Sequence, residues 1–161
     1  MLGTGSDGHS QPLGCGTVRR ALTIVSLLAL VAGCGNSDSL SHQELMTRMT
    51  AACTNWHKYQ STLEDPESAD DVGRYMHAQA QMIDTLTGTL AKLNPSGDDQ
   101  QHFDAFVAAL DGASDLFDQM ADAAKADDSP QMEAISARFD EAGAKVDTTA
   151  KALGATACTG G

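Results

Sequence analysis

After residue 40, apolar residues recur every three or four positions, which is the spacing of one face of an α-helix. The first run follows Ser41-His-Gln-Glu44, a capping box in which the serine and glutamate satisfy each other's backbone N–H groups. Its apolar positions are Leu45, Met49, Ala52, Trp56, Tyr59 and Leu63. Asp65-Pro66 predicts the end of this helix and the start of a second one, with Asp65 as N-cap. The second run comprises Val72, Tyr75 or Met76, Ala80, Met82 or Ile83, Leu86, Leu90 and Leu93.

Two further runs have the same helical spacing. Asn94-Pro95 separates the second run from the third, and Asp98 and Asp99 stand where acidic residues favour a helix N-terminus. The third run comprises Phe103, Val107, Leu110, Phe117, Met120 and Ala124. Ser129-Pro130 predicts the next N-cap and first turn, and Gly154 a C-terminal stop. The fourth run comprises Met132, Ile135, Phe139, Ala142, Val146, Ala150 and Leu153.

Four helical runs joined by short breaks predict an all-α fold. No stretch alternates with period two over the length of a strand, so we expect no sheet. Short connections favour antiparallel neighbours, and residues 41–161 are therefore predicted to form an up-down-up-down four-helix bundle. Counting residues from each predicted turn places four aromatic side chains at nearly the same level along the bundle axis. We therefore predict an aromatic layer in the core, with Trp56 largely buried. The layer would comprise Trp56, Tyr75, Phe117 and Phe139.

The pattern before residue 40 is different. Arg19-Arg20 precede an apolar run that ends in Val31-Ala32-Gly33-Cys34, an order typical of a secretory signal peptide. The run is about half as long as a bilayer-spanning helix needs to be. Val31-Ala32-Gly33-Cys34 resembles the lipobox of bacterial lipoproteins. The resemblance implies cleavage before Cys34 and a diacylglyceryl group on its sulfur.

This resemblance divides the chain into a signal peptide at 1–33, a lipidated tether at 34–40 and a bundle domain at 41–161. Residues 1–17 contain no Lys or Arg, which is unusual for the start of a signal peptide. One hypothesis is that 1–17 reflects a mis-assigned start and that translation begins at Val18. Mass spectrometry of the unprocessed precursor would test this hypothesis.

Charge narrows the range of partners. The chain has 22 acidic and 10 basic residues and a formal net charge of −12. Removal of a leader that contains Arg19, Arg20 and Asp7 would make the remainder more negative still. Such a domain repels phosphate backbones and anionic lipid headgroups, so we expect no nucleic acid and a membrane association that depends on the lipid. Cations and basic partners would be attracted.

Cys53 and Cys158 remain in the predicted mature domain, and exported proteins occupy oxidising compartments. We therefore predict a Cys53–Cys158 disulfide; the alternative is two isolated thiols. If Leu153 lies level with the start of the first helix, Cys53 is about 18–20 Å further along. Five extended residues span at most about 17–18 Å. Closure then requires a tail that turns back along the first helix, or a fourth helix that ends closer to Cys53.

Metal binding is the alternative function that the residues suggest. His42, Met46, Met49 and Cys53 share one stripe of the first helix, and Met82 is predicted to face it. Thioether and imidazole ligands suit Cu(I), so His42, Met46, Met49 and Met82 form a candidate copper site. The simpler interpretation is that the methionines fill the core.

Other polar groups give no catalytic motif. Asp99 and His102 have carboxylate-x-x-His spacing, but a di-iron bundle needs a second such pair and further glutamates. An acidic ridge, Asp111, Asp115, Asp118 and Asp122, is typical of a solvated helix face. No serine has a Gly-x-Ser-x-Gly setting. We therefore predict no enzyme and no cofactor.

Together, these patterns predict a membrane-anchored extracytoplasmic lipoprotein whose helical domain is a non-enzymatic binding or envelope-interaction module. The lipid on Cys34 would hold it to the outer face of the cytoplasmic membrane, or to the outer membrane in a Gram-negative source. Its partner would be an envelope protein or a cation. A copper-handling lipoprotein is the alternative.

Overall fold

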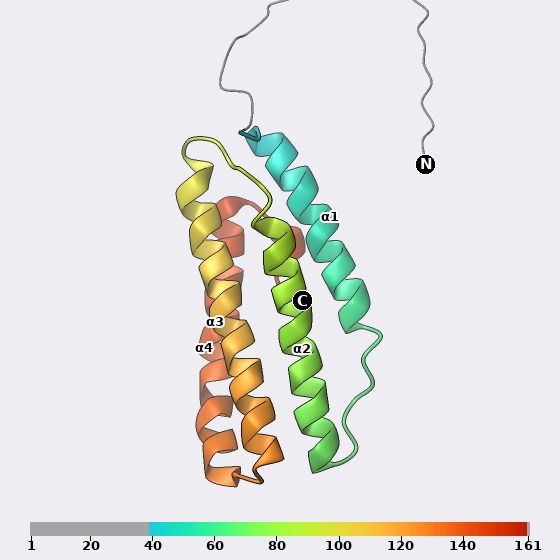
Figure 1. Ribbon diagram of the computed structural model, residues 1–161. Coiled ribbons are helices and arrows are strands. Elements are labelled where there is room, and N and C mark those ends of the chain that lie inside the picture. Colours follow the sequence, from blue (N-terminus) through green and yellow to red (C-terminus); the bar gives the residue numbers. More distant parts are fainter. Residues whose placement is uncertain (1–38, 161) are drawn as a thin grey trace, which may run out of the picture. The chain divides into compact units, whose positions relative to one another are not determined.

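The computed structural model describes residues 39–160, and this part of the chain forms four antiparallel helices (Figure 1). They are α1 (His42–Gln60), α2 (Ala69–Leu90), α3 (Asp99–Lys125) and α4 (Ser129–Leu153), followed by a short 3-10 helix, η1 (Thr156–Cys158). No strand occurs in this range, and the single isolated bridge pairs Leu40 with Pro95. The predicted all-α four-helix bundle is thus confirmed. The predicted signal peptide, the lipobox and Cys34 lie outside the described residues.

The capping box of α1 forms as predicted. The Glu44 N–H donates to Ser41 Oγ over 3.4 Å, and the Ser41 N–H donates to Glu44 Oε2 over 3.0 Å. The hydrogen bonds from the side chain and backbone of Ser41 lower the pKa of the Glu44 carboxyl. A charged carboxylate in the first turn also interacts favourably with the positive end of the helix dipole.

Two predicted N-caps are wrong by one to three residues. Ser68, rather than Asp65, caps α2, because its Oγ accepts a hydrogen bond from the Asp71 N–H over 3.2 Å. Asp128, rather than Ser129, caps α4, because its Oδ1 accepts from the Gln131 N–H over 3.0 Å. In both cases several residues near the break have suitable side chains, and the local turn geometry selects one.

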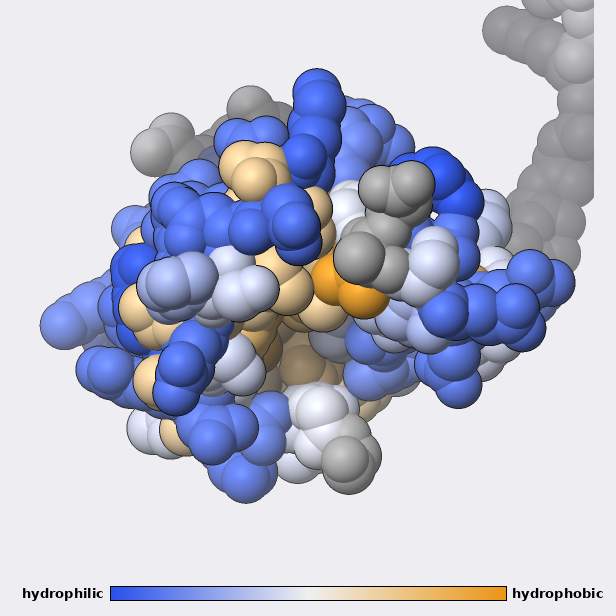
Figure 2. Space-filling model, turned by 90° about the horizontal axis from the view of Figure 1, so that it is seen from below, coloured by the Kyte–Doolittle hydropathy of each residue, from blue (hydrophilic) through white to orange (hydrophobic). Residues whose placement is uncertain are grey.

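The core consists of two apolar clusters. The larger one joins all four helices and the C-terminal tail, and its largest fully buried side chains are Phe106, Leu45, Met49, Leu90 and Leu110. The smaller cluster lies on α3 and α4 and comprises Leu116, Met120, Ala123 and Ile135. Because α1 ends well above the lower end of α2, that end of the bundle is built from three helices (Figure 1). Seen from there, apolar side chains line a hollow with a hydrophilic rim (Figure 2).

The predicted aromatic layer does not form as one unit among the described residues. The rings of Phe117 and Phe139 pack at a tilt of 54° with centroids 4.8 Å apart, whereas the centroid of the Trp56 ring lies 4.6 Å from that of His57. Tyr59, predicted on the inner face of α1, is 63% exposed. The reason is that α1 packs mainly on α2 and η1 and approaches α3 and α4 little, so its last turns face no third helix.

We expect Gly154→Ala to lower the free energy of unfolding by about 1 kcal/mol, because Gly154 ends α4 with φ 85°, a left-handed conformation that an L side chain disfavours. Gly143→Ala is the matched control. Gly143 lies in the interior of α4 with open space around it, so alanine should stabilise the helix by about 0.5–1 kcal/mol. Urea unfolding followed by circular dichroism measures both, and equal effects of the two substitutions would contradict the role of the Gly154 conformation.

Candidate functional site

The candidate site begins with an apolar hollow between α1 and α2. It has a volume of about 410 Å³. Its lining residues are Ala52, Asn55, Trp56, Tyr59, Thr62, Met82, Thr85, Leu86 and Thr89. Hollows of this size with mostly apolar walls and a few polar groups at the rim are typical of binding sites.

Two aromatic side chains of α1 dominate this hollow. Trp56 is half-buried, so the prediction of a largely buried tryptophan is only partly correct. Its indole Nε1 is nevertheless inaccessible to solvent and has no hydrogen-bond partner within residues 39–160. Tyr59, one turn further on, is the exposed large hydrophobic side chain of the described chain. The apolar surface of α1 therefore continues out of the core and into the hollow.

A second hollow lies nearer the N-terminus of α2. It lies between segment 61–68 and α2, has a volume of about 950 Å³ and is bordered by acidic side chains. Its lining residues are Leu63, Glu64, Asp65, Pro66, Glu67, Asp71, Arg74, Tyr75 and Ala78. Arg74 forms an ion pair with Asp71, which leaves Glu64, Asp65 and Glu67 without an ion pair in the described structure.

The two hollows lie along one face of α2. The α2 residues that line them include Asp71, Tyr75, Ala78, Met82, Thr85 and Thr89, at spacings of 4, 3, 4, 3 and 4. Positions at this spacing lie one above the other on a helix. We call the combined feature the α1–α2 groove, with an apolar half around Trp56 and an acidic half around Glu64, Asp65 and Glu67.

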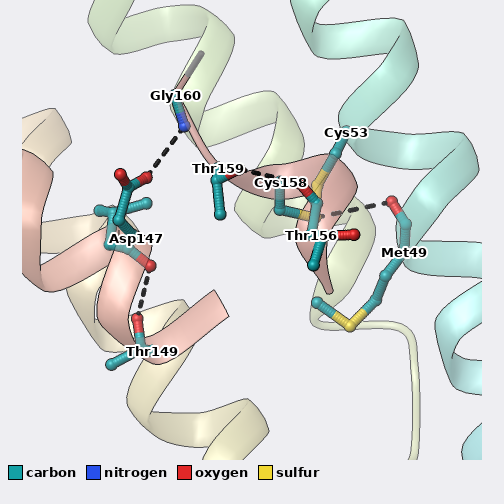
Figure 3. Close-up of a disulfide and its surroundings, with 9 residues drawn as sticks. Met49, Cys53, Asp147, Thr149, Thr156, Cys158, Thr159 and Gly160 are labelled. Carbon is teal, nitrogen blue, oxygen red and sulfur yellow. Dashed lines mark hydrogen bonds between the residues drawn. A yellow bond between two sulfur atoms is a disulfide. The ribbon is translucent and has the colours of Figure 1, made fainter. Parts of the chain in front are cut away.

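The disulfide predicted between Cys53 and Cys158 is present, with its Cα atoms 5.0 Å apart (Figure 3). The position of a Cβ on Gly154 would lie 3.9 Å from Met46 Sδ, so α4 ends about one turn past the start of α1. Cys53 is then only about 10 Å further along α1, by the helical rise. The four residues that lead from Gly154 to Cys158 and include η1 can span that distance, which resolves the reach problem. The Gly160 N–H donates to Asp147 Oδ1 over 2.9 Å and ties the tail to α4.

The four residues of the candidate copper site do not meet at one place. His42 is exposed, and its Nδ1 lies 2.9 Å from Asp99 Oδ1. Met82 lines the groove beside Ala52 and Trp56, which lie about 15–21 Å beyond His42 along α1. Met49 is fully buried in the larger core cluster, and Met46 packs against that cluster. The methionine stripe of α1 therefore serves as core packing.

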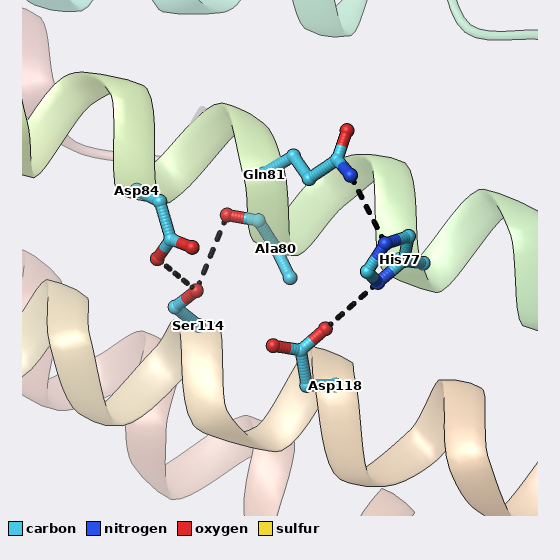
Figure 4. A network of polar contacts seen from close by, with 6 residues as sticks. All are labelled: His77, Ala80, Gln81, Asp84, Ser114 and Asp118. Atoms are coloured by element: carbon cyan, nitrogen blue, oxygen red, sulfur yellow. Dashed lines mark hydrogen bonds and ion pairs between the residues drawn. The ribbon is translucent and has the colours of Figure 1, made fainter.

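Several polar side chains of α2 and α3 form a network across the two helices (Figure 4). Ser114 Oγ lies 2.7 Å from Asp84 Oδ1 and 3.2 Å from the Ala80 carbonyl oxygen, so its one hydroxyl proton is shared between two acceptors. His77 Nδ1 lies 3.0 Å from Asp118 Oδ1, while Gln81 Nε2 lies 3.0 Å from His77 Nε2. The serine and the histidine have different carboxylate partners, so the network joins helices and provides no activated nucleophile.

The other two candidates from the sequence are solvated. His102 is exposed, and Asp99 pairs with His42 instead. The ridge residues Asp111, Asp115 and Asp122 are exposed, and Asp118 bonds to His77. Among residues 39–160, no three His, Cys, Asp or Glu side chains are grouped as metal ligands. None of the helices in the same range has the length and hydrophobicity needed to cross a membrane.

Comparison with protein-family models, curated proteins and solved structures gives no match to this chain. Sequence reasoning assigned Tyr59 to the core and did not identify the groove. The sequence did contain a signal for the groove. In Glu64-Asp-Pro-Glu67, three acidic residues surround a proline just after a helix end rich in aromatic residues, which indicates an exposed acidic surface next to an apolar one.

Proposed function

We propose that this protein is a lipid-anchored, extracytoplasmic and non-enzymatic binding module, and that the α1–α2 groove is its binding site. The observation that carries the proposal is the Cys53–Cys158 disulfide within a domain that follows a lipobox-like sequence. Both cysteines are buried, at 0% and 1% exposure, and close a loop with a sequence separation of 105. Structural disulfides of this kind persist outside the cytoplasm, where thiols are oxidised.

The start of the described chain is consistent with a short anchor. The Leu40 N–H donates to the Asn94 carbonyl over 2.6 Å, which fixes Leu40 against the α2–α3 connection. Leu40 is six positions after Cys34, and an extended segment of that length spans about 20 Å. A lipid on Cys34 would therefore hold the domain within about 20 Å of the bilayer.

A binding role fits the polar groups better than catalysis does. The groove has aromatic and aliphatic walls, while the polar pairs outside it, His77–Asp118 and Ser114–Asp84, join helices to each other. Apolar recesses with charged edges are typical of surfaces that recognise other molecules.

We expect Cys34→Ala to abolish incorporation of labelled palmitate and to leave either uncleaved precursor or a soluble form, because the sulfur is the attachment point for the lipid. Metabolic labelling with immunoprecipitation measures the first effect, and membrane fractionation measures the second. Cys53→Ala is the matched control: it removes another cysteine and should retain the label. Label in Cys34→Ala, or no label in the unmodified chain, would refute the lipid anchor.

A further inference from the structure

We infer that the α1–α2 groove receives a basic amphipathic helix of a partner protein, with the apolar face of that helix against the Trp56 half and its Lys or Arg side chains beside the acidic half. This inference rests on the proposed function and specifies the partner's chemistry. It depends on three observations: the length of the groove, its apolar wall and the negative charge of its acidic half.

The length of the groove favours a helix over a small ligand. Asp71 and Thr89 are 18 positions apart on α2, which places them about 27 Å apart along the helix axis. A partner helix of about 18 residues would match this length and lie alongside α2. Because α1 ends at Gln60, the wall opposite the lower part of α2 is the non-helical segment 61–68. A helix in the groove would supply the packing that a longer α1 would give.

The apolar half offers anchoring contacts. Tyr59 is 63% exposed beside half-buried Trp56 and Met82. Aromatic side chains supply much of the energy at protein interfaces, and methionine adapts to the shapes of different partners. Helices bound in such grooves place apolar residues at i, i+3, i+4 and i+7, the same repeat that lines this face of α2.

The acidic half of the groove determines the sign of the charge that the partner must carry. Four carboxylates, Glu64, Asp65, Glu67 and Asp71, border it, with Arg74 as the one basic lining residue. Because Arg74 pairs with Asp71, the other three carboxylates set the local potential. A fatty acid, an anionic lipid or an acidic peptide would be repelled there, whereas Lys and Arg would form charge pairs with these carboxylates.

The probe is a synthetic 18-residue helix of leucine and lysine, with leucine at helical spacing on one face. Trp56 is the single tryptophan of the chain and lies in the groove, so its fluorescence reports occupancy directly. The full chain is reconstituted in phosphatidylcholine vesicles, and empty vesicles serve as the blank. We expect a saturable shift of the Trp56 emission to shorter wavelength at one peptide per chain, and an increase in helical circular dichroism beyond the sum of the parts.

Two variants test the two halves. Glu64→Gln, Asp65→Asn and Glu67→Gln combined should weaken binding about tenfold, given about 0.2–1 kcal/mol for each exposed charge pair. Asp111→Asn, Asp115→Asn and Asp122→Asn combined are the control: they change the net charge equally on the exposed ridge of α3 and should alter affinity less than twofold. Tyr59→Ser should weaken binding about tenfold through the apolar half alone.

Three outcomes would overturn the inference: no saturable change with the leucine–lysine helix, equal binding of a leucine–glutamate helix, or equal loss in the ridge control, which would indicate non-specific charge attraction. Palmitate labelling of the same preparation distinguishes a failure of the proposed lipid anchor from a failure of the proposed basic-helix partner. A labelled chain that does not bind the peptide refutes the basic-helix partner alone, and an unlabelled chain that binds it refutes the lipid anchor alone.

Discussion

Replacing both Cys53 and Cys158 by alanine is expected to lower the free energy of unfolding by about 4 kcal/mol. The disulfide closes a loop with a sequence separation of 105, and opening it gives the unfolded chain more conformational freedom. The effect should be concentrated in α1, because that helix packs mainly on α2 and on η1, and η1 is the segment that the disulfide holds. Hydrogen exchange in α1 should therefore accelerate more than in α3.

Urea unfolding followed by circular dichroism measures this change. The unmodified chain with its disulfide reduced is the control, because it keeps both sulfur atoms in the core and loses only the covalent link. It should be destabilised nearly as much as the alanine variant. A reduced chain as stable as the oxidised one would show that the link contributes little and that the packing of η1 suffices.

Phe106→Ala is expected to lower the free energy of unfolding by about 3–5 kcal/mol, the range for removing a large aromatic side chain from a close-packed core. Phe106 is 0% exposed and belongs to the larger core cluster with residues from α1, α2 and α4. The surrounding side chains lie on several elements, so the cavity should collapse only partly. Denaturant unfolding at constant m-value measures the loss.

Val107→Ala is the matched control for Phe106→Ala. It lies next to Phe106 on α3 but is only half-buried, so its truncation should cost about 1 kcal/mol. Comparable losses for the two residues would show that Phe106 is not a central core residue. The comparison also tests the orientation of α3 about its axis.

The orientation of α3 shows how far the sequence predicts this fold. The helical period correctly places Phe103, Leu110 and Met120 inside, but the same period allows either Phe106 or Val107 as the next inner residue. The prediction chose Val107, and the structure buries Phe106. Because α3 packs on both α2 and α4, its buried surface is wider than one stripe and includes small residues such as Ala109 and Ala121. The position of the neighbouring helices decides this, and local spacing does not encode it.

Predictions from local chemistry succeeded at two helix ends, although the N-caps of α2 and α4 were misplaced. The capping box at Ser41 and the stop at Gly154 involve residues close in sequence, and both are confirmed. The disulfide was predicted from the cysteine count and from the oxidising compartment of exported proteins. The course of the C-terminal tail to Cys53 could not be predicted, because it depends on where α4 ends relative to Met46. The groove was missed because it arises from the early end of α1 beside the longer α2, a difference that helical periodicity does not reveal.

The disulfide also has a consequence for proteolysis. A single backbone cut anywhere between Cys53 and Cys158 would leave the two fragments covalently joined, because both ends of that interval meet at the same sulfur–sulfur bond. α2, α3, α4 and the acidic half of the groove all lie within this interval. A protease that clips the exposed turns would thus nick the domain without shedding any part of it. If Cys34 carries the proposed lipid, release from the membrane would require a cut between Cys34 and Cys53, an interval that helix α1 occupies from His42 onward.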